Sequence, residues 1–299
     1  MIATIHHFDE SLEAAHRLAK LLGFVCQAIN VRRFPDGESL VQVAETDATA
    51  ILYRSLDHPN EKLIELVLAA SALRERGARR VVLVAPYLGY MRQDIAFQPG
   101  EAVSQKVIGT LLATHFDALV TVDPHLHRTA SLAAVVPGID AIAVSAAATL
   151  ADLLRPEGVQ GTILIGPDSE SRPWVESVAA PLGLPVMVGE KRRLGDRQVQ
   201  LAIAGIEHVR GRPVVLIDDL ISSGGTLARC AELLLRAGAA RVEAVATHCL
   251  ASPDDLAKLA RAGIARVRST DTVAGPTASV AIASALAAAL VKLVPTRAQ

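Results

Sequence analysis

The chain has 299 residues, of which 51% are hydrophobic, 20% are charged and only 3% are aromatic. Its formal net charge of −1 excludes the strongly basic surface on which nucleic-acid binding usually depends, so we expect no nucleic-acid partner. Three cysteines without CxxC spacing argue against a disulfide or zinc framework and favour a reducing, cytoplasmic location. The length suffices for two hydrophobic cores, which favours two domains.

The N-terminal segment has no basic region followed by an apolar core, so we expect no signal peptide. The first polar motif is Arg33–Glu38, which precedes an alternating stretch, Ser39–Val43. This pattern is typical of a hairpin turn in which Pro35 and Gly37 shape the backbone. The pattern alone does not separate that structural role from a binding role.

Four apolar runs each stop at a proline or an aspartate, as buried strands do at the edge of a sheet. These runs are Val81–Val84, Ala118–Val122, Thr162–Ile165 and Val214–Ile217. Helical patterns lie between them, so the chain is predicted to be an α/β protein with mainly parallel sheets flanked by helices. We place the domains at residues 1–145 and 146–299. Ligands of such folds bind at the carboxyl ends of the strands.

Polar residues follow the first two of these runs. The motif Arg92-Gln93-Asp94 lies in a glycine-flanked loop, which by itself fits either a solvent-exposed connection or a binding site. His125 and His127 follow the second run, next to Asp123. No cysteine or third ligand is close in sequence, so a magnesium-associated histidine and acid, or plain polar residues at the core edge, fit better than zinc.

The next run ends near Asp168, a carboxylate that a hard cation would accept. Farther along, Lys191-Arg192-Arg193 forms a basic run of the kind usually found on solvated surfaces. The Gly195-Asp196 pair that follows it indicates a mobile loop, which suits a lid that closes on polyphosphate. Both interpretations of the basic run stay open on this pattern.

The most informative segment is residues 214–226. Asp218 and Asp219 follow its apolar run and precede the turn Ser222-Ser223-Gly224-Gly225-Thr226, after which a helical pattern begins. The glycines let backbone N–H groups approach an anion, and the hydroxyls and the helix N-terminus add further attraction. Carboxylates repel phosphate but suit the neutral hydroxyls of a vicinal diol. The segment therefore predicts a sugar-phosphate site, and it lacks the lysine spacing of a P-loop.

The most apolar C-terminal stretch, Ala278–Val291, is too short and too rich in alanine to span a bilayer, so we expect no membrane partner. Its larger apolar residues recur at helical spacing and predict one face of a docking helix. They are Ile282, Leu286, Leu290 and Leu293. This helix is free to pack on either domain, the N-terminal one included.

The segment 214–226 resembles the phosphoribosyl diphosphate (PRPP) loop of type I phosphoribosyltransferases and PRPP synthetases. From about residue 30 onward, the order and spacing of the motifs resemble the PRPP synthetase (ribose-phosphate diphosphokinase) family. The motifs are Phe34–Glu38, Pro86–Asp94, Thr121–His125, Gly166–Asp168, Lys191–Arg193 and Asp218–Thr226. The first five together are specific to the synthetases. Thr247-His248 and Ser269–Thr272 also match the family pattern.

The resemblance implies two phosphoribosyltransferase-like domains and transfer of the diphosphoryl group of ATP to ribose 5-phosphate, giving PRPP and AMP. It implies that Lys191 and Arg193 are catalytic and that His125 and Asp168 hold Mg²⁺. The implied ribose 5-phosphate site contains Asp218, Asp219, Ser222, Ser223, Gly224, Gly225 and Thr226. The implied ATP site contains Phe34, Asp36, Glu38, Arg92, Gln93 and Asp94. In the family, the first three come from the neighbouring subunit of a homo-oligomer.

Several positions depart from the family pattern. Synthetases often carry an acid at the position of Ser222 and a threonine at that of Ser223. The loop Ile95–Gly100 lacks the basic residues of the bacterial and animal enzymes and looks closer to the archaeal type. Two alternatives stay open. The first is a phosphoribosyltransferase, which would consume PRPP, and the Phe34 and Arg92 motifs count against it. The second is a non-catalytic regulatory subunit, which would be expected to have lost the lid or metal residues.

Overall fold

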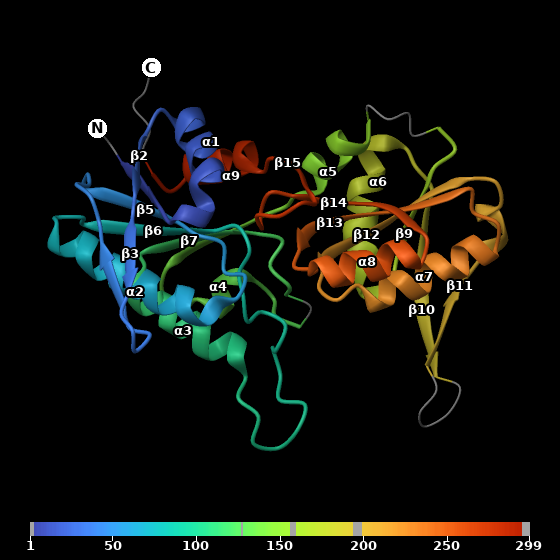
Figure 1. Ribbon diagram of the computed structural model, residues 1–299, viewed down its shortest axis with the longest axis horizontal. Helices are drawn as coiled ribbons and strands as arrows, with labels where there is room; N and C mark the ends of the chain where they lie inside the picture. Colours follow the sequence, from blue (N-terminus) through green and yellow to red (C-terminus); the bar gives the residue numbers. More distant parts are fainter. Residues whose placement is uncertain (1–2, 127, 156–159, 194–198, 295–299) are drawn as a thin grey trace. The chain divides into compact units, whose positions relative to one another are not determined.

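The computed structural model describes residues 3–126, 128–155, 160–193 and 199–294, and it describes side chains outside residues 191–200. The chain forms two compact units (Figure 1). The first contains Met1–Ser145 together with Ile282–Gln299, and the second contains Ala146–Ala281. Within the described residues, no helix is long and apolar enough to cross a membrane.

The first unit contains a six-stranded parallel sheet of order β2-β1-β5-β6-β7-β8. Its strands are β1 (Thr4–His7), β2 (Val25–Ala28), β5 (Thr49–Tyr53), β6 (Arg80–Ala85), β7 (Ala118–Val122) and β8 (Asp140–Val144). Its helices are η1 (Asp9–Ser11), α1 (Leu12–Leu22), α2 (Pro59–Glu75), α3 (Ser104–His115), α4 (Leu132–Val135) and α9 (Ala283–Leu290). A separate antiparallel hairpin joins β3 (Asn30–Arg33) to β4 (Ser39–Gln42).

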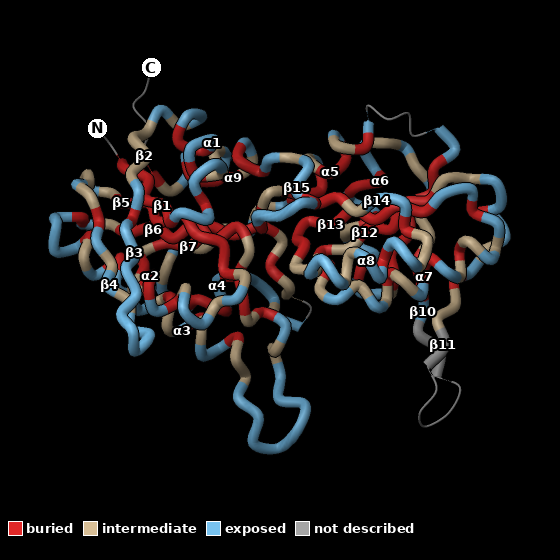
Figure 2. Tube along the Cα trace, viewed as in Figure 1, coloured by how far each residue is buried: buried red, intermediate tan, exposed pale blue. Residues whose placement is uncertain are grey.

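Helices cover both faces of this sheet, with α1 and α9 on one side and α2, α3 and α4 on the other (Figure 1). Parallel strands buried on both faces need continuous apolar sequence, and every residue of β7 is buried. Figure 2 shows the buried strands between more exposed helices. The apolar face of α9 contacts α1 and β7, and Ile282, Leu286 and Leu290 are fully buried. The C-terminal helix therefore completes the core of the first unit.

The second unit contains a seven-stranded sheet of order β11-β10-β9-β12-β13-β14-β15, parallel except for the β10–β11 pair. Its strands are β9 (Ile163–Gly166), β10 (Val186–Arg193), β11 (Val199–Ile203), β12 (Pro213–Ile221), β13 (Arg241–Cys249), β14 (Ile264–Thr270) and β15 (Ala278–Val280). Its helices are α5 (Ala147–Leu154), η3 (Ser169–Ser171), α6 (Arg172–Ala179), η4 (Ala180–Leu182), η5 (Ile206–Val209), α7 (Gly225–Arg236) and α8 (Pro253–Arg261). Figure 1 shows α5 and α6 on one face and α7 and α8 on the other.

The predicted α/β class and the four predicted buried strands are confirmed. One boundary differs, because the carboxylates Asp218 and Asp219 do not end their strand. Instead β12 continues to Ile221, and Asp218 and Leu220 pair with Ala246 and His248 of β13. The strand extends because β13 is equally long and supplies backbone hydrogen-bonding partners beyond the apolar run. The carboxylates thus project from a fixed strand rather than from a loop.

Candidate active site

Three acidic side chains of the second unit lie at the carboxyl ends of two adjacent strands. Strands β9 and β12 pair in parallel, with Leu216 opposite Ile165. Asp218 and Asp219 lie in the last part of β12, and Asp168 follows β9 by two residues. Asp219 is only 5% exposed, and its backbone N–H donates to Oδ1 of Asp218 over 3.1 Å.

The charges of these carboxylates act on one another. Burial raises the pKa of Asp218 well above its usual value, and the negative charges of Asp219 and Asp168 raise it further. Ionised Asp218 is therefore held at high free energy, because burial and the neighbouring carboxylates both disfavour its charge. A divalent cation or the hydroxyl groups of a polyol would relieve this repulsion. The cluster has the oxygen ligands that Mg²⁺ prefers.

The start of α7 lies directly after this strand. Gly224 occupies the N-cap position with a φ of 72°, and a Cβ there would lie 2.7 Å from Cδ2 of Leu259. Gly225 differs, since a Cβ on it would meet no atom within 4 Å. Gly224 is therefore needed for the backbone turn, whereas the space at Gly225 is open to a ligand. The first N–H groups of a helix attract anions, and here Ser223 and Gly225 are exposed.

The loop that carries Asp168 is held in place from two sides. The Asp168 side chain accepts a hydrogen bond from the backbone N–H of Glu170 over 3.2 Å and caps η3. The thiol of Cys230 on α7 donates to the carbonyl of Pro167 over 3.7 Å. These contacts connect the Asp168 loop to the same helix whose N-terminus forms the proposed phosphate site. The two parts of the candidate site are therefore positioned together.

The basic run lies on a hairpin of the second unit. Lys191 and Arg193 belong to β10, where their backbones pair with Leu201 and Val199 of β11. The first strand of this hairpin, β10, pairs with β9 (Figure 1). The side chains of Lys191 and Arg193, and the loop predicted around Gly195, lie outside the described residues.

A buried network of hydroxyl groups supports the ends of β13 and β14. The hydroxyls of Thr270 and Thr272 both donate to the carbonyl of Thr247, over 2.7 and 2.9 Å. The Thr272 hydroxyl also lies 2.8 Å from Nδ1 of His248. All four residues are buried. Sequence patterns gave these residues no physical role, because their hydrogen bonds join segments more than twenty residues apart.

In the first unit, the Phe34 motif forms the tip of the β3–β4 hairpin. The backbone N–H of Phe34 donates to the carbonyl of Glu38, and Asp36 accepts from the N–H of Glu38 over 3.2 Å. The side chain of Phe34 is 37% exposed and lies 5.5 Å from the guanidinium of Arg32. Asp36 and Glu38 are also exposed. The turn predicted from Pro35 and Gly37 is present, and its polar and aromatic residues face solvent.

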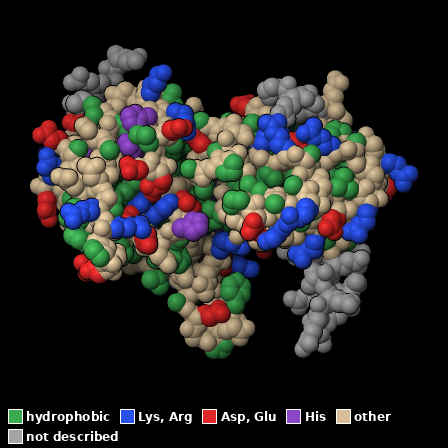
Figure 3. Space-filling model, in the orientation of Figure 1, with side chains coloured by type: hydrophobic (Ala, Val, Ile, Leu, Met, Phe, Trp, Pro, Cys, Tyr) green, Lys and Arg blue, Asp and Glu red, His purple; other side chains and the backbone are tan. Residues whose placement is uncertain are grey.

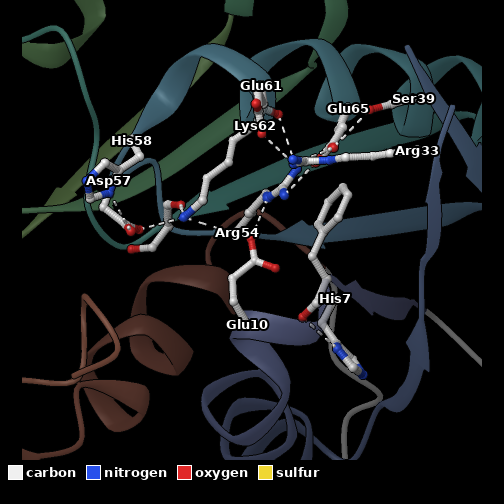
Figure 4. Close-up of polar contacts among 12 residues, drawn as sticks. His7, Glu10, Arg33, Ser39, Arg54, Asp57, His58, Glu61, Lys62 and Glu65 are labelled. Carbon is white, nitrogen blue, oxygen red and sulfur yellow. Dashed lines mark hydrogen bonds and ion pairs between the residues drawn. The ribbon is translucent and has the colours of Figure 1, made fainter. Parts of the chain in front are cut away.

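A network of ion pairs fastens this hairpin to α2 (Figure 4). Glu65 on α2 is 1% exposed and lies 2.6 Å from Arg54. Arg33 and Ser39, at the two ends of the hairpin turn, reach the other Glu65 oxygen over 3.4 and 3.0 Å. Burial acts to raise the pKa of Glu65, but Arg54, Ser39 and Arg33 outweigh it and hold the pKa below its usual value.

The Arg92 motif divides into one exposed and two internally bonded side chains. Arg92 is exposed. Gln93 accepts a hydrogen bond from the Ser104 hydroxyl at the start of α3 over 2.8 Å. The side chain of Asp94 is 3% exposed and lies 3.0 Å from that of Arg128. Gln93 and Asp94 therefore shape this loop through hydrogen bonds within the chain.

The candidate metal ligands come from both units. His125 is half-buried and follows β7 of the first unit, whereas Asp168 belongs to the second unit. Asp123, two residues before His125, has a φ of 34°, and its backbone N–H donates to the carbonyl of Val144 on β8 over 2.9 Å. His127 lies outside the described residues.

Two family models match the chain. Residues 3–115 match the N-terminal domain of ribose phosphate pyrophosphokinase, and residues 139–276 match the phosphoribosyl transferase domain. Ribose-phosphate pyrophosphokinase of Methanopyrus kandleri is 35% identical over 95% of this chain and 97% of its own. That of Thermococcus kodakarensis is 33% identical over 92% and 94%.

A solved structure is similar over nearly the whole length. Phosphoribosylpyrophosphate synthetase from Mycobacterium smegmatis superposes with a TM-score of 0.83 at 26% identity, covering 97% of this chain and 98% of the other. Its match extends through both units, as do the matches of the archaeal relatives. The chain therefore belongs to the ribose-phosphate pyrophosphokinase family.

Proposed function

We propose that this chain is a cytoplasmic ribose-phosphate diphosphokinase, which transfers the diphosphoryl group of ATP to the 1-hydroxyl of ribose 5-phosphate. The products would be PRPP and AMP, and PRPP would serve nucleotide biosynthesis. The observation that carries the proposal is the carboxylate cluster of Asp168, Asp218 and Asp219 next to the open N-terminus of α7. This pairing of acids with an anion site matches a sugar that carries both hydroxyls and a phosphate.

Ribose 5-phosphate would bind at the end of β12. Asp218 and Asp219 would accept hydrogen bonds from the ribose hydroxyls, which are neutral donors. The 5-phosphate would receive the N–H groups of the α7 N-terminus and the nearby hydroxyls. The residues assigned to it are Ser222, Ser223, Gly224, Gly225 and Thr226. The open space at Gly225 supports this assignment, because phosphate oxygens need room close to the backbone.

ATP would bind through residues of the first unit. The exposed Phe34 ring and the Asp36 and Glu38 carboxylates would form an adenine pocket for a neighbouring subunit of a homo-oligomer. Their exposure supports this assignment, since an exposed aromatic ring on a firmly held turn is suited to a partner's ligand. Arg92 would contact ATP phosphates, with Gln93 and Asp94 completing that site.

Mg²⁺ is assigned to Asp168 of the second unit, and the family pattern adds His125 of the first. The fit rests on the donor set, because burial and the charges of Asp219 and Asp168 disfavour ionisation of Asp218, and a cation would offset this. When bound, Mg²⁺ neutralises charge on the ATP phosphates. Lys191 and Arg193 would close over the transferring group and stabilise its negative charge. The residues assigned to ribose 5-phosphate and to ATP would orient the 1-hydroxyl and the phosphate chain for in-line attack. No covalent intermediate with the protein is then required.

The decisive experiment measures AMP and PRPP formation from ATP, with omission of ribose 5-phosphate or Mg²⁺ as controls. We expect both products in equal amounts and only when all components are present. Formation of a nucleotide from PRPP and a free base, without ATP consumption, would instead identify a phosphoribosyltransferase. If the folded chain forms no product but changes the activity of a second synthetase, it is a regulatory subunit.

A further inference from the structure

Two histidines and a cysteine of the first unit gather on one face of its sheet. His7 is the last residue of β1, Cys26 lies on the neighbouring strand β2, and His16 lies on α1. The register places Ile5 opposite Cys26, and His7 follows Ile5 by two residues. Because side chains two apart point to the same face, His7 and Cys26 share a face, and α1 packs on both strands. The three residues thus come from three adjacent elements.

The distances are those of a potential ligand set. One ring nitrogen of His7, one of His16 and Sγ of Cys26 all lie within 4.8 Å of one another. The two imidazole rings meet edge to face, with centroids 5.4 Å apart. Zinc with bonds of about 2.0–2.3 Å places its ligand atoms roughly 3.3–3.8 Å apart, so shifts of about 1 Å would close the set.

The hydrogen bonding of His7 supports metal binding. Its Nδ1 lies 3.1 Å from the backbone carbonyl of Phe8, and a carbonyl oxygen only accepts hydrogen bonds. Nδ1 therefore carries the proton, and the lone pair is on Nε2. Metal-binding histidines commonly donate their second ring nitrogen to a carbonyl or carboxylate in this way, which fixes the tautomer. Figure 4 shows His7 with this contact, apart from the Arg54 ion pairs.

We propose that His7, His16 and Cys26 bind one zinc ion, with water at the fourth position. The nitrogen and sulfur ligands favour zinc over magnesium, which prefers oxygen. An ion can enter from outside, since His16 is exposed and Cys26 half-buried, and Figure 3 shows histidine at the surface over α1. The sequence pattern did not indicate this site, because its two histidines and its cysteine are not closely spaced along the chain.

The bound ion would link three elements at one edge of the sheet. β2 is the terminal strand of its sheet and pairs only with β1 among the described strands. Zinc held by β1, α1 and β2 would therefore restrain the edge strand and the helix that covers it. This role is independent of the proposed diphosphoryl transfer, and the ligand set contains none of the residues assigned to ATP, ribose 5-phosphate or Mg²⁺.

The test titrates the full, chelator-treated and dialysed chain with Co²⁺, then with Zn²⁺, in excess Mg²⁺. We expect one Co²⁺ per chain, a thiolate-to-cobalt charge-transfer band, and displacement of cobalt by zinc. Cys26→Ser should abolish the band. His16→Ala should weaken Zn²⁺ binding by at least about 100-fold, because loss of even an outer-shell partner weakens affinity by roughly 10–100-fold. Zinc should raise the unfolding temperature of the original chain but not that of His16→Ala.

Two controls separate this site from other metal binding. His58→Ala removes a histidine whose side chain is 90% exposed in the same unit, and it should leave the titration unchanged. Asp218→Asn alters the carboxylate cluster of the second unit and should also leave it unchanged. Absence of the charge-transfer band in the folded original chain would overturn the proposal. Equal Zn²⁺ affinity in the original chain and in folded His16→Ala would overturn it as well.

Discussion

The two units share one sheet architecture but build their candidate sites differently. In the second unit, the site lies at the carboxyl ends of β9 and β12, and its shape comes from strand register and the start of α7. In the first unit, the Phe34 motif lies on a hairpin outside the main sheet. Side-chain ion pairs to Glu65 hold this hairpin on α2. One site is thus part of the backbone framework, and the other is an attachment with an exposed tip.

This comparison predicts different responses to substitution. Changes at the second unit's loop should abolish binding of one substrate without unfolding the chain, provided that the replaced atom faces open space. Changes at the hairpin should divide into those that weaken its attachment and those that alter only its tip. Four substitutions test this division in order of the expected size of the effect, and an experiment on mixed oligomers extends the last of them.

The largest effect is expected for Gly225→Val, which fills the space assigned to the 5-phosphate. No protein atom lies within 4 Å of a Cβ at this position, so the folded chain should keep its unfolding temperature. Ribose 5-phosphate binding, measured by calorimetry, should be lost. Gly224→Ala is the matched control, since its Cβ would approach Leu259 and its φ of 72° is strained for alanine, so it should lower stability as well. Normal ribose 5-phosphate binding by Gly225→Val would place the phosphate elsewhere.

A smaller but still large effect is expected at the other hairpin, β10–β11. Lys191→Ala should lower kcat by a factor on the order of 10²–10⁴ with little change in KM for ribose 5-phosphate, because in the proposed mechanism its charge acts on the transferring group. Lys106→Ala on α3 is an exposed control and should leave kcat unchanged. Steady-state kinetics with ATP and Mg²⁺ gives both constants. An unchanged kcat in Lys191→Ala would show that the basic run is a solvated surface with no catalytic role.

The sequence indicated the local structure of residues 218–226 more directly than that of the first unit's hairpin network. These residues are contiguous, so local rules about strands, glycine turns and helix N-termini apply to them. The strand boundary was wrong because β13 extends β12 beyond its apolar residues, which is a tertiary effect. The proximity of Asp168 to Asp218 depends on the strand order, whereas the sequence pattern indicated only that Asp168 follows a strand.

The first unit's network could not be predicted from local patterns. Glu65 lies eleven residues from Arg54 and twenty-six from Ser39, and sequence spacing does not say which charges meet. The proposed zinc ligands could not be inferred from spacing for the same reason, since pairing of β1 with β2 and packing of α1 on both strands bring His7, Cys26 and His16 together. The turn itself was predictable, because Pro35 and Gly37 restrict it locally.

The third prediction tests the attachment of the hairpin. Glu65→Gln leaves Arg54 buried with fewer charge partners, and it should reduce the free energy of unfolding by about 3 kcal/mol at pH 7. Because the folded pKa of Glu65 is below its ordinary value of 4.5, its stabilisation is complete above that pH and is lost as pH falls through the folded value. The difference between the variant and the original chain should therefore shrink below pH 4.5. Urea unfolding at several pH values measures it, and a constant difference would contradict the ion-pair account.

The smallest effect is expected for Phe34→Ala at the tip, where the partly exposed ring lies over the exposed Arg32. Loss of aromatic stacking should raise KM for ATP by about 10-fold, since such contacts contribute roughly 0.5–1.5 kcal/mol. KM for ribose 5-phosphate and the unfolding temperature should stay unchanged, and Leu40→Ala on the same hairpin should be silent.

If the tip of the β3–β4 hairpin contributes to the ATP site of a neighbouring subunit, oligomers that mix two variant chains should regain activity. Asp219→Asn alters the proposed ribose site of the second unit, whereas Phe34→Ala leaves that site intact. After dissociation and reassembly of a mixture, some sites should combine an intact hairpin from one chain with an intact β12 from the other. Those hybrid sites should have the original KM for ATP and restore part of the activity that the mixture lacks before reassembly. Full activity in an isolated monomer would show instead that Phe34 serves its own chain or no ATP site at all.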